Sequence, residues 1–283
     1  MKVLVTGATG YVGAAVVRRL EADGHSVRAF SRASGGDISD PADVERAMDG
    51  VDAVVNLVAI LEGSPEQFER VVVGGARNVV AAARAAGVSR LLHMSALGVT
   101  EEHAPLTGYW GAKWRAKRAV TESDLEWTVF EPSFVFSQGG GAFAEFERLT
   151  RLPLVPVIGD GRYRHQPVWL GDVAAAFSRA LGRPGTIRNV YPLGGPQVFT
   201  FDELLDEIAR VTGRRAHPKL HAPAGFVRLQ ARLLLRRLPP PLRVTPDQIT
   251  MLLAGTECDL TPMREGLGIE PASIGEAYTR AFV

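Results

Sequence analysis

The sequence predicts a doubly wound, parallel α/β fold with a small α/β C-terminal lobe, and three observations carry that prediction. Short, almost wholly apolar segments alternate with segments of helical periodicity through the first half of the chain, a pattern typical of a parallel sheet covered on both faces. A glycine-rich turn joins the first apolar segment to the first helix. With 283 residues, the chain is long enough for one large α/β domain that carries a smaller lobe.

The glycine-rich turn lies in Thr6–Gly13, after a strand expected at Val3–Val5. In such a unit the first glycine makes the tight turn, the second lets the backbone approach a pyrophosphate, and the third lets helix and strand pack closely. These positions are Gly7, Gly10 and Gly13. The free N–H groups and positive dipole end of the helix that follows favour phosphate. The placement between strand and helix therefore predicts a nucleotide site of the Rossmann type.

Further elements follow in alternation up to Pro132. Asp40 is expected to cap a short helix that has a proline at its first position. The other expected strands are His25–Ser31, Val51–Val58, Arg90–Ser95 and Trp127–Glu131, and the expected helices are Pro41–Met48, Val71–Ala86 and Thr107–Glu122.

The pattern changes from about residue 132 onward, where glycines and prolines become frequent and the apolar segments become short. Helices are still expected at Val168–Leu181 and Phe201–Thr212. We interpret residues 1–283 as a single dinucleotide-binding domain whose second half contributes a small substrate lobe, not as two independent domains.

Composition narrows the class of protein. Hydrophobic residues at 46% and charged residues at 22% are ordinary for a globular protein, and a net charge of +1 argues against a nucleic-acid binder. Cys258 is the only cysteine, and the histidines lack metal-ligand spacing with carboxylates, so neither disulfides nor a metal site are expected. The chain begins directly in its first strand and has no apolar run of about 18 residues, so we expect a cytoplasmic protein.

One pair of side chains is suited to proton transfer. Tyr109 and Lys113 are four residues apart in an expected helix and therefore share one of its faces. A phenol with its ordinary pKa of about 10 is a poor acid or base at neutral pH. A nearby ammonium favours the phenolate and lowers that pKa, so the tyrosine can exchange a proton with a substrate hydroxyl or carbonyl.

The chain resembles the short-chain dehydrogenase/reductase superfamily, in its extended and atypical, epimerase/dehydratase-like branches, over nearly its whole length. Thr6–Gly13 is similar to the family's nucleotide motif, and Tyr109–Lys113 to its catalytic Tyr-x-x-x-Lys. The other similar segments are Gly36–Asp40 on the adenine side, Val55–Ala59 beside the cofactor, Glu131–Phe136 near the nicotinamide, and Gln166–Ala174. His93–Gly98, Leu193–Pro196 and Leu267–Pro271 are similar to the nucleotide-binding accessory subunit of respiratory complex I.

The resemblance implies a role for each matching residue. Tyr109 is the expected general acid/base, Lys113 the residue that activates it and holds the ribose, and Ser95 the group that orients the substrate oxygen. If the register is shifted by one residue, Ala96 takes the position of this third catalytic group. In the alternative structural role of Ser95, its hydroxyl is bonded to nearby backbone. The expected cofactor-binding residues are Gly7, Thr9, Gly10, Tyr11, Val12, Gly13, Ser31, Arg32, Asp37, Ile38, Leu57, Val58, Ala59, Tyr109, Lys113, Pro132 and Val135.

The end of the second strand indicates which dinucleotide is bound. An acid there binds the ribose 2′-hydroxyl of NAD, whereas a nearby arginine accommodates the 2′-phosphate of NADP. The sequence has Ser31 and Arg32 at this point, and Asp37 comes later in the segment that the resemblance assigns to the adenine. We therefore expect NADP over NAD.

Two functions from different classes remain open. The first is an NADP-dependent oxidoreductase or epimerase that acts on a hydroxyl or carbonyl of a small molecule, with Arg162, Arg164 and His165 in a loop that either contacts the substrate or is solvated. The second is a non-catalytic NAD(P)H-binding protein of a respiratory or membrane-associated complex. Residues 225–238 alternate leucines and arginines, which fits either a weak membrane or protein partner or an ordinary solvated helix.

Overall fold

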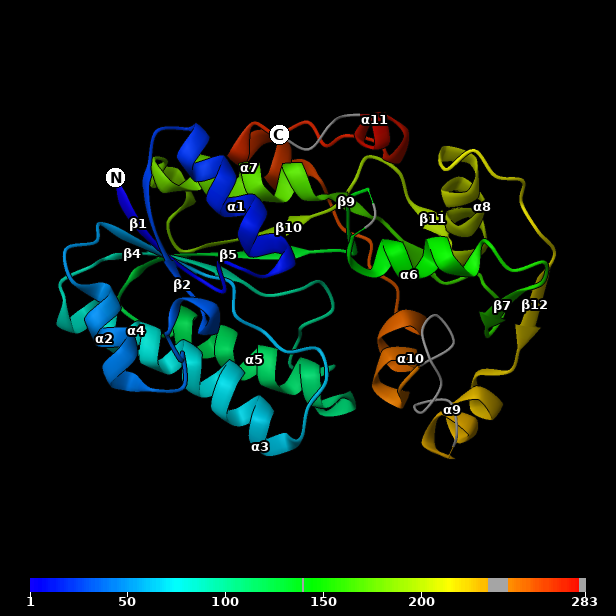
Figure 1. The fold of residues 1–283 in the computed structure, drawn as a ribbon, viewed down its shortest axis with the longest axis horizontal. Coiled ribbons are helices and arrows are strands. Elements are labelled where there is room, and N and C mark those ends of the chain that lie inside the picture. The colour runs from blue at the N-terminus through cyan, green and yellow to red at the C-terminus, as the bar shows by residue number, and fades with distance from the viewer. Residues whose placement is uncertain (139, 234–243, 280–283) are drawn as a thin grey trace.

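A six-stranded sheet organises the computed structural model, which describes residues 1–138, 140–233 and 244–279 (Figure 1). Its strands are β1 (Lys2–Thr6), β2 (Ser26–Phe30), β3 (Ala53–Asn56), β4 (Arg90–Met94), β5 (Glu126–Pro132) and β10 (Asn189–Leu193). They lie in the order β10-β5-β4-β3-β1-β2, and every pairing is parallel. The predicted doubly wound parallel sheet is confirmed.

Helices cover both faces of the sheet (Figure 1). One face carries α1 (Tyr11–Ala22) and α7 (Leu170–Leu181), and the other carries α2 (Pro41–Met48), α4 (Gly75–Ala85) and α5 (Gly108–Thr121). Side chains of β1 alternate between these layers, since Val3 and Val5 pack with residues of α1 and α7 whereas Leu4 packs with residues of α2 and α4. Burial on both sides explains why the strands are so apolar.

The order of the strands fixes the place of a ligand crevice. The chain runs from β1 outward to β2 and then returns to place β3 on the other side of β1. In open α/β sheets, ligands bind outside the carboxyl ends of the strands at such a reversal. The glycine turn follows β1, and therefore lies at this reversal.

A small lobe is built from the second half of the chain and lies on the right in Figure 1. Two apolar clusters hold it together, one around Phe143, Val157 and Leu204 and one around Val227 and Ile249. Its elements are β6 (Val135–Phe136), α6 (Gly141–Leu149), β7 (Val155–Ile158), β8 (Arg164–His165), β9 (Val168–Trp169), β11 (Phe199–Thr200), α8 (Phe201–Val211), β12 (Lys219–Ala222), α9 (Ala224–Leu233), α10 (Pro246–Leu253) and α11 (Ile274–Thr279).

Some element boundaries differ from the sequence prediction. The helix expected from Val168 begins at Leu170, because Val168 and Trp169 pair with β6. The helix expected over residues 71–86 begins as the short helix α3 (Pro65–Gln67) and a π-helical segment, Phe68–Gly74, before α4. Within the predicted amphipathic segment 225–238, α9 accounts for the first part, and residues 234–238 lie outside the described residues.

Candidate dinucleotide and active site

The glycine turn after β1 has the geometry of a phosphate cradle. Gly7 has a φ of 73°, in the left-handed region that favours glycine. A Cβ atom on Gly13 would lie 2.0 Å from the Gly7 carbonyl oxygen, so only glycine lets α1 begin this close to the turn. Gly10 caps α1 without a side-chain hydrogen bond, and no acidic residue lies in the first turn. The first N–H groups of α1 are thus available to an anion.

A segment from the small lobe reaches this turn. The Tyr11 hydroxyl donates to Ser137 Oγ at 2.9 Å, although the two residues are 126 positions apart. Gly140 and Gly141 pack against the Tyr11 ring so closely that an added Cβ would lie 2.3 and 2.8 Å from its carbons. The start of α1 is therefore held between the sheet and the loop that precedes α6.

A row of polar side chains crosses three strands beside the turn. Thr6 Oγ1 donates to Asn56 Oδ1 at 2.8 Å, and Asn56 Nδ2 lies 3.2 Å from His93 Nδ1. Because the amide oxygen of Asn56 already accepts from Thr6, its nitrogen is the donor to His93 Nδ1, which places the ring proton on Nε2. Burial lowers the pKa of His93 to about 3, with the positive charges of Lys113 and Lys117 acting in the same direction. The imidazole is therefore neutral.

Two buried polar atoms at the end of β4 have no hydrogen-bond partner within the described part of the chain, namely His93 Nε2 and Ser95 Oγ. The exposed fractions of these residues are 2% and 1%. Residues two apart in an extended segment point to the same side, so both atoms lie on one face. Buried polar groups are rarely left unsatisfied. The backbone-bonded alternative for Ser95 is therefore not what the structure has.

We expect the neutral state of His93 to make the fold acid-sensitive. Its folded pKa of about 3 lies below the ordinary value of 6.5. Between these values the unfolded chain binds a proton that the folded chain does not, so the free energy of unfolding falls as pH drops. The free energy of unfolding of the wild type should fall by on the order of 4 kcal/mol across this pH window, and that of His93→Gln should not show this fall. Urea unfolding at several pH values measures both. Parallel curves for wild type and variant would contradict this expectation.

Lys113 lies in the interior next to the same strand end. It is 1% exposed, and its Nζ donates to the Met94 carbonyl oxygen at 2.7 Å. Burial lowers the pKa of Lys113 to about 8. The Lys113 amine thus lies at the carboxyl end of β4, where Ser95 follows Met94.

Tyr109 is half-buried one helical turn before Lys113, among the apolar side chains of Phe68, Val72 and Ile60. Burial raises the pKa of Tyr109 to about 12. The lowering expected from a neighbouring ammonium is not found, because the Lys113 amine is directed to Met94. The phenol is protonated at neutral pH, which suits a proton donor better than a proton acceptor.

The small lobe contacts the start of α5, next to Tyr109, a feature that sequence reasoning missed. Asp247, at the start of α10, accepts a hydrogen bond of 3.0 Å from the backbone N–H of Gly108. Gln248 Nε2 donates to Glu62 Oε1 at 3.1 Å. These contacts join residues 139 and 186 positions apart, and nothing local in the sequence signals them.

The residues expected around the adenine lie at the end of β2. Ser31 caps a short 3₁₀ turn by accepting from the backbone N–H of Ser34 at 3.3 Å, whereas Arg32 is exposed. Hydrogen bonds from the backbone and side chain of Ser39 lower the pKa of Asp37, and the nearby charges of Arg70 and Arg32 add to this. Ile38 is buried, and its carbonyl accepts from Asn78 Nδ2 at 2.9 Å.

The remaining expected cofactor contacts flank the reversal of strand order. Leu57 is buried and its N–H donates to the Thr6 carbonyl at 3.2 Å, which draws the β3 loop onto the glycine turn. Val58 lies 3.3 Å from the Cβ position of Gly7, and Ala59 follows it, half-buried. Pro132 is the last residue of β5, and Val135 begins β6. Thr9 and Val12 lie in the turn and in the first turn of α1.

The polar loop expected at Gly159–His165 is partly a strand. His165 belongs to β8 and is fully buried against Phe134 and Phe201, so it is neither solvated nor on an open surface. Arg164 is paired with Glu257 at 2.9 Å. Of the three residues named for this loop, Arg162 and Arg164 are exposed.

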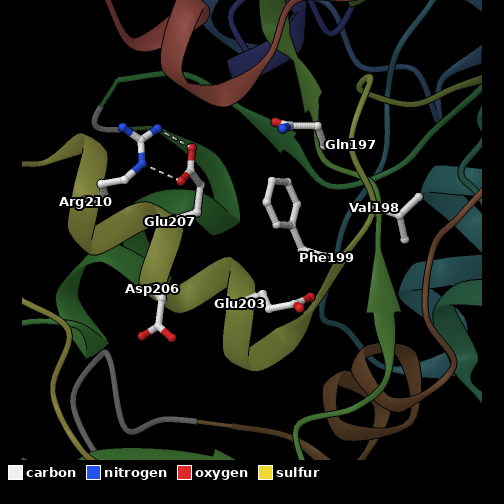
Figure 2. Close-up of a pocket in the computed structure, with 7 residues that line it drawn as sticks. All are labelled: Gln197, Val198, Phe199, Glu203, Asp206, Glu207 and Arg210. Carbon is white, nitrogen blue, oxygen red and sulfur yellow. Dashed lines mark hydrogen bonds and ion pairs between the residues drawn. The ribbon is translucent and has the colours of Figure 1, made fainter.

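A hollow of about 620 Å³ lies elsewhere, along α8 in the small lobe (Figure 2). The Phe199 ring faces it, and its charged groups are already engaged. Glu207 and Arg210 form two hydrogen bonds of 2.6 Å, Asp206 pairs with Lys219, and Glu203 accepts from the N–H of Thr200. The glycine turn differs from this hollow, since the start of α1 has no side-chain cap and its first N–H groups are available.

Comparison of the sequence with known proteins finds a reductase and a subunit of a respiratory complex among its relatives. The chain is similar to 2-alkyl-3-oxoalkanoate reductase of Stenotrophomonas maltophilia, with 28% identity over 99% of this chain and 98% of the relative. It is also similar to NADH dehydrogenase [ubiquinone] 1 alpha subcomplex subunit 9 of Dictyostelium discoideum, with 27% identity over 75% of this chain and 59% of that protein.

The fold is shared with solved epimerases. UDP-glucose 4-epimerase of Thermotoga maritima, solved with UDP-glucose, superimposes with a TM-score of 0.75 over 98% of this chain and 96% of the enzyme, at 22% identity. A sequence profile of the NAD dependent epimerase/dehydratase family matches residues 3–194. That range holds the glycine turn, the polar row, Tyr109 and Lys113, and the chain belongs to the NAD-dependent epimerase/dehydratase family.

Proposed function

We propose that this protein is an NADP-dependent oxidoreductase or epimerase that acts on a hydroxyl or carbonyl of a small molecule. The observation that carries the proposal is the meeting of Lys113, the free hydroxyl of Ser95 and the face of Tyr109 at the carboxyl end of β4. This edge of the sheet adjoins the glycine turn, so a substrate oxygen there would lie next to the reactive end of a bound dinucleotide.

The residues present fit a dinucleotide. The glycine cradle, which an added Cβ would fill, and the uncapped start of α1 would hold the pyrophosphate. The nicotinamide group, when bound, supplies or accepts hydride. Ser95 would donate a hydrogen bond that orients the substrate oxygen, Tyr109 would transfer the one proton to that oxygen, and Lys113 would hold the ribose hydroxyls.

The test of this proposal is oxidation of NADPH by the full-length protein across a panel of carbonyl compounds. A 2-alkyl-3-oxoalkanoate belongs in the panel because a relative is a reductase of such acids. UDP-glucose, with which a neighbouring epimerase was solved, is tested separately by following formation of its epimer, because an epimerisation oxidises no NADPH overall. Turnover of one compound supports the proposal. NADPH bound without any turnover supports the second function below.

Arg32 is expected to select NADP over NAD. It is exposed beside the end of β2, where an arginine can pair with a 2′-phosphate. We expect Arg32→Ala to weaken NADPH binding about tenfold or more, the loss of one charge-assisted contact, and to leave NADH binding nearly unchanged. Isothermal titration measures both. Arg215→Ala, at an exposed arginine of the small lobe, is the matched control, and tighter binding of NADH than NADPH by the wild type would refute the assignment.

A second function, a non-catalytic NAD(P)H-binding subunit, is favoured by one observation. Tyr109 adjoins the contact between Gly108 and Asp247, and burial raises the pKa of its phenol to about 12. A protein that only binds the dinucleotide would need Lys113 and the glycine turn but no access to Tyr109. Purification with stoichiometric respiratory or membrane partners, together with an inactive panel, would favour this function.

A further inference from the structure

Basic residues are concentrated in one part of this chain. Between Glu207 and Asp247 the sequence has no Asp or Glu and nine Lys or Arg, whereas the rest has 23 Lys or Arg against 31 Asp or Glu. The nine are Arg210, Arg214, Arg215, Lys219, Arg228, Arg232, Arg236, Arg237 and Arg243. A net charge of +1 therefore combines a strongly basic segment with an acidic remainder.

The described part of this segment forms the end of the small lobe, through the last turn of α8, β12 and α9 (Figure 1). Large apolar side chains are exposed here. Phe226 and Leu229 of α9 are each 56% exposed, and Leu220 of β12 is 55% exposed. Isolated exposed leucines are ordinary, but a group of them with an aromatic ring marks an interaction surface.

One face of α9 is anchored and another is free. Val227 and Ala231 are buried against Ile249 of α10, which fixes the helix to the lobe. Phe226 and Leu229, three residues apart, share a different face, and the exposed Arg228 lies between them in sequence. Arg228 lies on another side of the helix from these two residues and donates to Thr250 Oγ1 of α10 at 3.4 Å. The apolar face of Phe226 and Leu229 is not needed for the core.

The neighbouring two-stranded sheet extends the apolar surface. Leu220 lies opposite Pro156 in the parallel pairing of β12 with β7, and Ala222 lies opposite Ile158. Ile158 and Ala222 are covered by the α9–α10 cluster, whereas Leu220 at the other end of the same face is open. Leu154, just before β7, is also 48% exposed.

We propose that this lobe tip, defined by Leu154, Leu220, Phe226, Arg228 and Leu229, docks on the surface of an anionic lipid bilayer. Aromatic and aliphatic side chains enter the boundary between headgroups and acyl chains, while arginines pair with lipid phosphates. Arg210, Arg214 and Lys219 pair with Glu207, Glu147 and Asp206, so the exposed Arg228 is the cation that the lobe tip itself presents. Within the described ranges, every helix falls short of the length and apolarity that a bilayer crossing needs, so the protein would lie on the membrane.

The proposal is tested by co-sedimentation of the full-length protein with vesicles. We expect binding to phosphatidylcholine vesicles that contain one third phosphatidylglycerol, little binding to pure phosphatidylcholine, and loss of binding as salt screens the charges. The double variant Phe226→Ser/Leu229→Ser is expected to weaken binding about tenfold or more, and Arg228→Glu to weaken it as well. All three side chains are exposed, so these variants keep the core contacts of α9.

Leu106→Ser is the matched control, because Leu106 is 54% exposed just before α5. It should bind vesicles as the wild type does, and thermal unfolding should be similar for all variants. Equal binding to neutral and anionic vesicles would overturn the proposal, as would unchanged binding of the Phe226/Leu229 variant. Complete absence of vesicle binding would also overturn it, and is the result expected if an acidic protein is the partner instead.

Discussion

Replacing Tyr109 by phenylalanine is expected to lower kcat about 10²- to 10⁴-fold, the range typical of losing a positioned general acid. The phenol holds its proton, with a pKa raised to about 12 by burial. It is therefore the residue that can protonate a substrate oxygen as negative charge develops there. Measurement requires the carbonyl compound that gives the highest turnover in the NADPH panel.

The same variant should bind NADPH nearly as well as the wild type. The phenylalanine ring retains the packing of Tyr109 on Phe68 and Val72, and Lys113 stays bonded to Met94. Tyr191→Phe removes a phenol from β10 in the sheet core instead, and should leave kcat unchanged. A Tyr109→Phe enzyme with wild-type kcat would show that another group delivers the proton.

Features set by neighbouring residues could be predicted from the sequence. The glycine turn was recognisable because its three glycines have fixed spacing and follow an apolar segment. The strands of the sheet were recognisable because both of their faces are buried. Tyr109 and Lys113 were expected one turn apart in a helix, and both lie in α5.

Features set by distant contacts could not be predicted in this way. The pKa of Tyr109 depends on burial among side chains such as Phe68, so a rule based on Lys113 alone gave the wrong direction. The role of His93 was equally hidden, because it depends on Asn56 and Thr6, which precede it by 37 and 87 positions and align only through strand register. His165 was assigned to a loop because two-residue strands such as β8 leave no periodic pattern.

Gly13→Ala is expected to cause the largest combined loss of stability and dinucleotide affinity of any single methyl addition in the glycine turn. The new Cβ would lie 2.0 Å from the Gly7 carbonyl oxygen, 2.8 Å from the Gly7 carbonyl carbon and 3.1 Å from that of Ala8. All three are backbone atoms, so no side chain can rotate away to relieve the contact. The start of α1 must move away from β1, or the turn must open.

Either movement would misalign the N–H groups that face the pyrophosphate, because their directions are fixed by the close approach of α1 to the turn. We expect the free energy of unfolding to fall by about 3 kcal/mol and NADPH affinity to fall about 100-fold or more, measured by urea unfolding and isothermal titration. Gly182→Ala is the matched control, since its Cβ would meet no atom within 4 Å and its φ of −96° is open to alanine. If Gly13→Ala and Gly182→Ala both bound NADPH with wild-type affinity, the nucleotide site would not depend on the close packing of α1 on the turn.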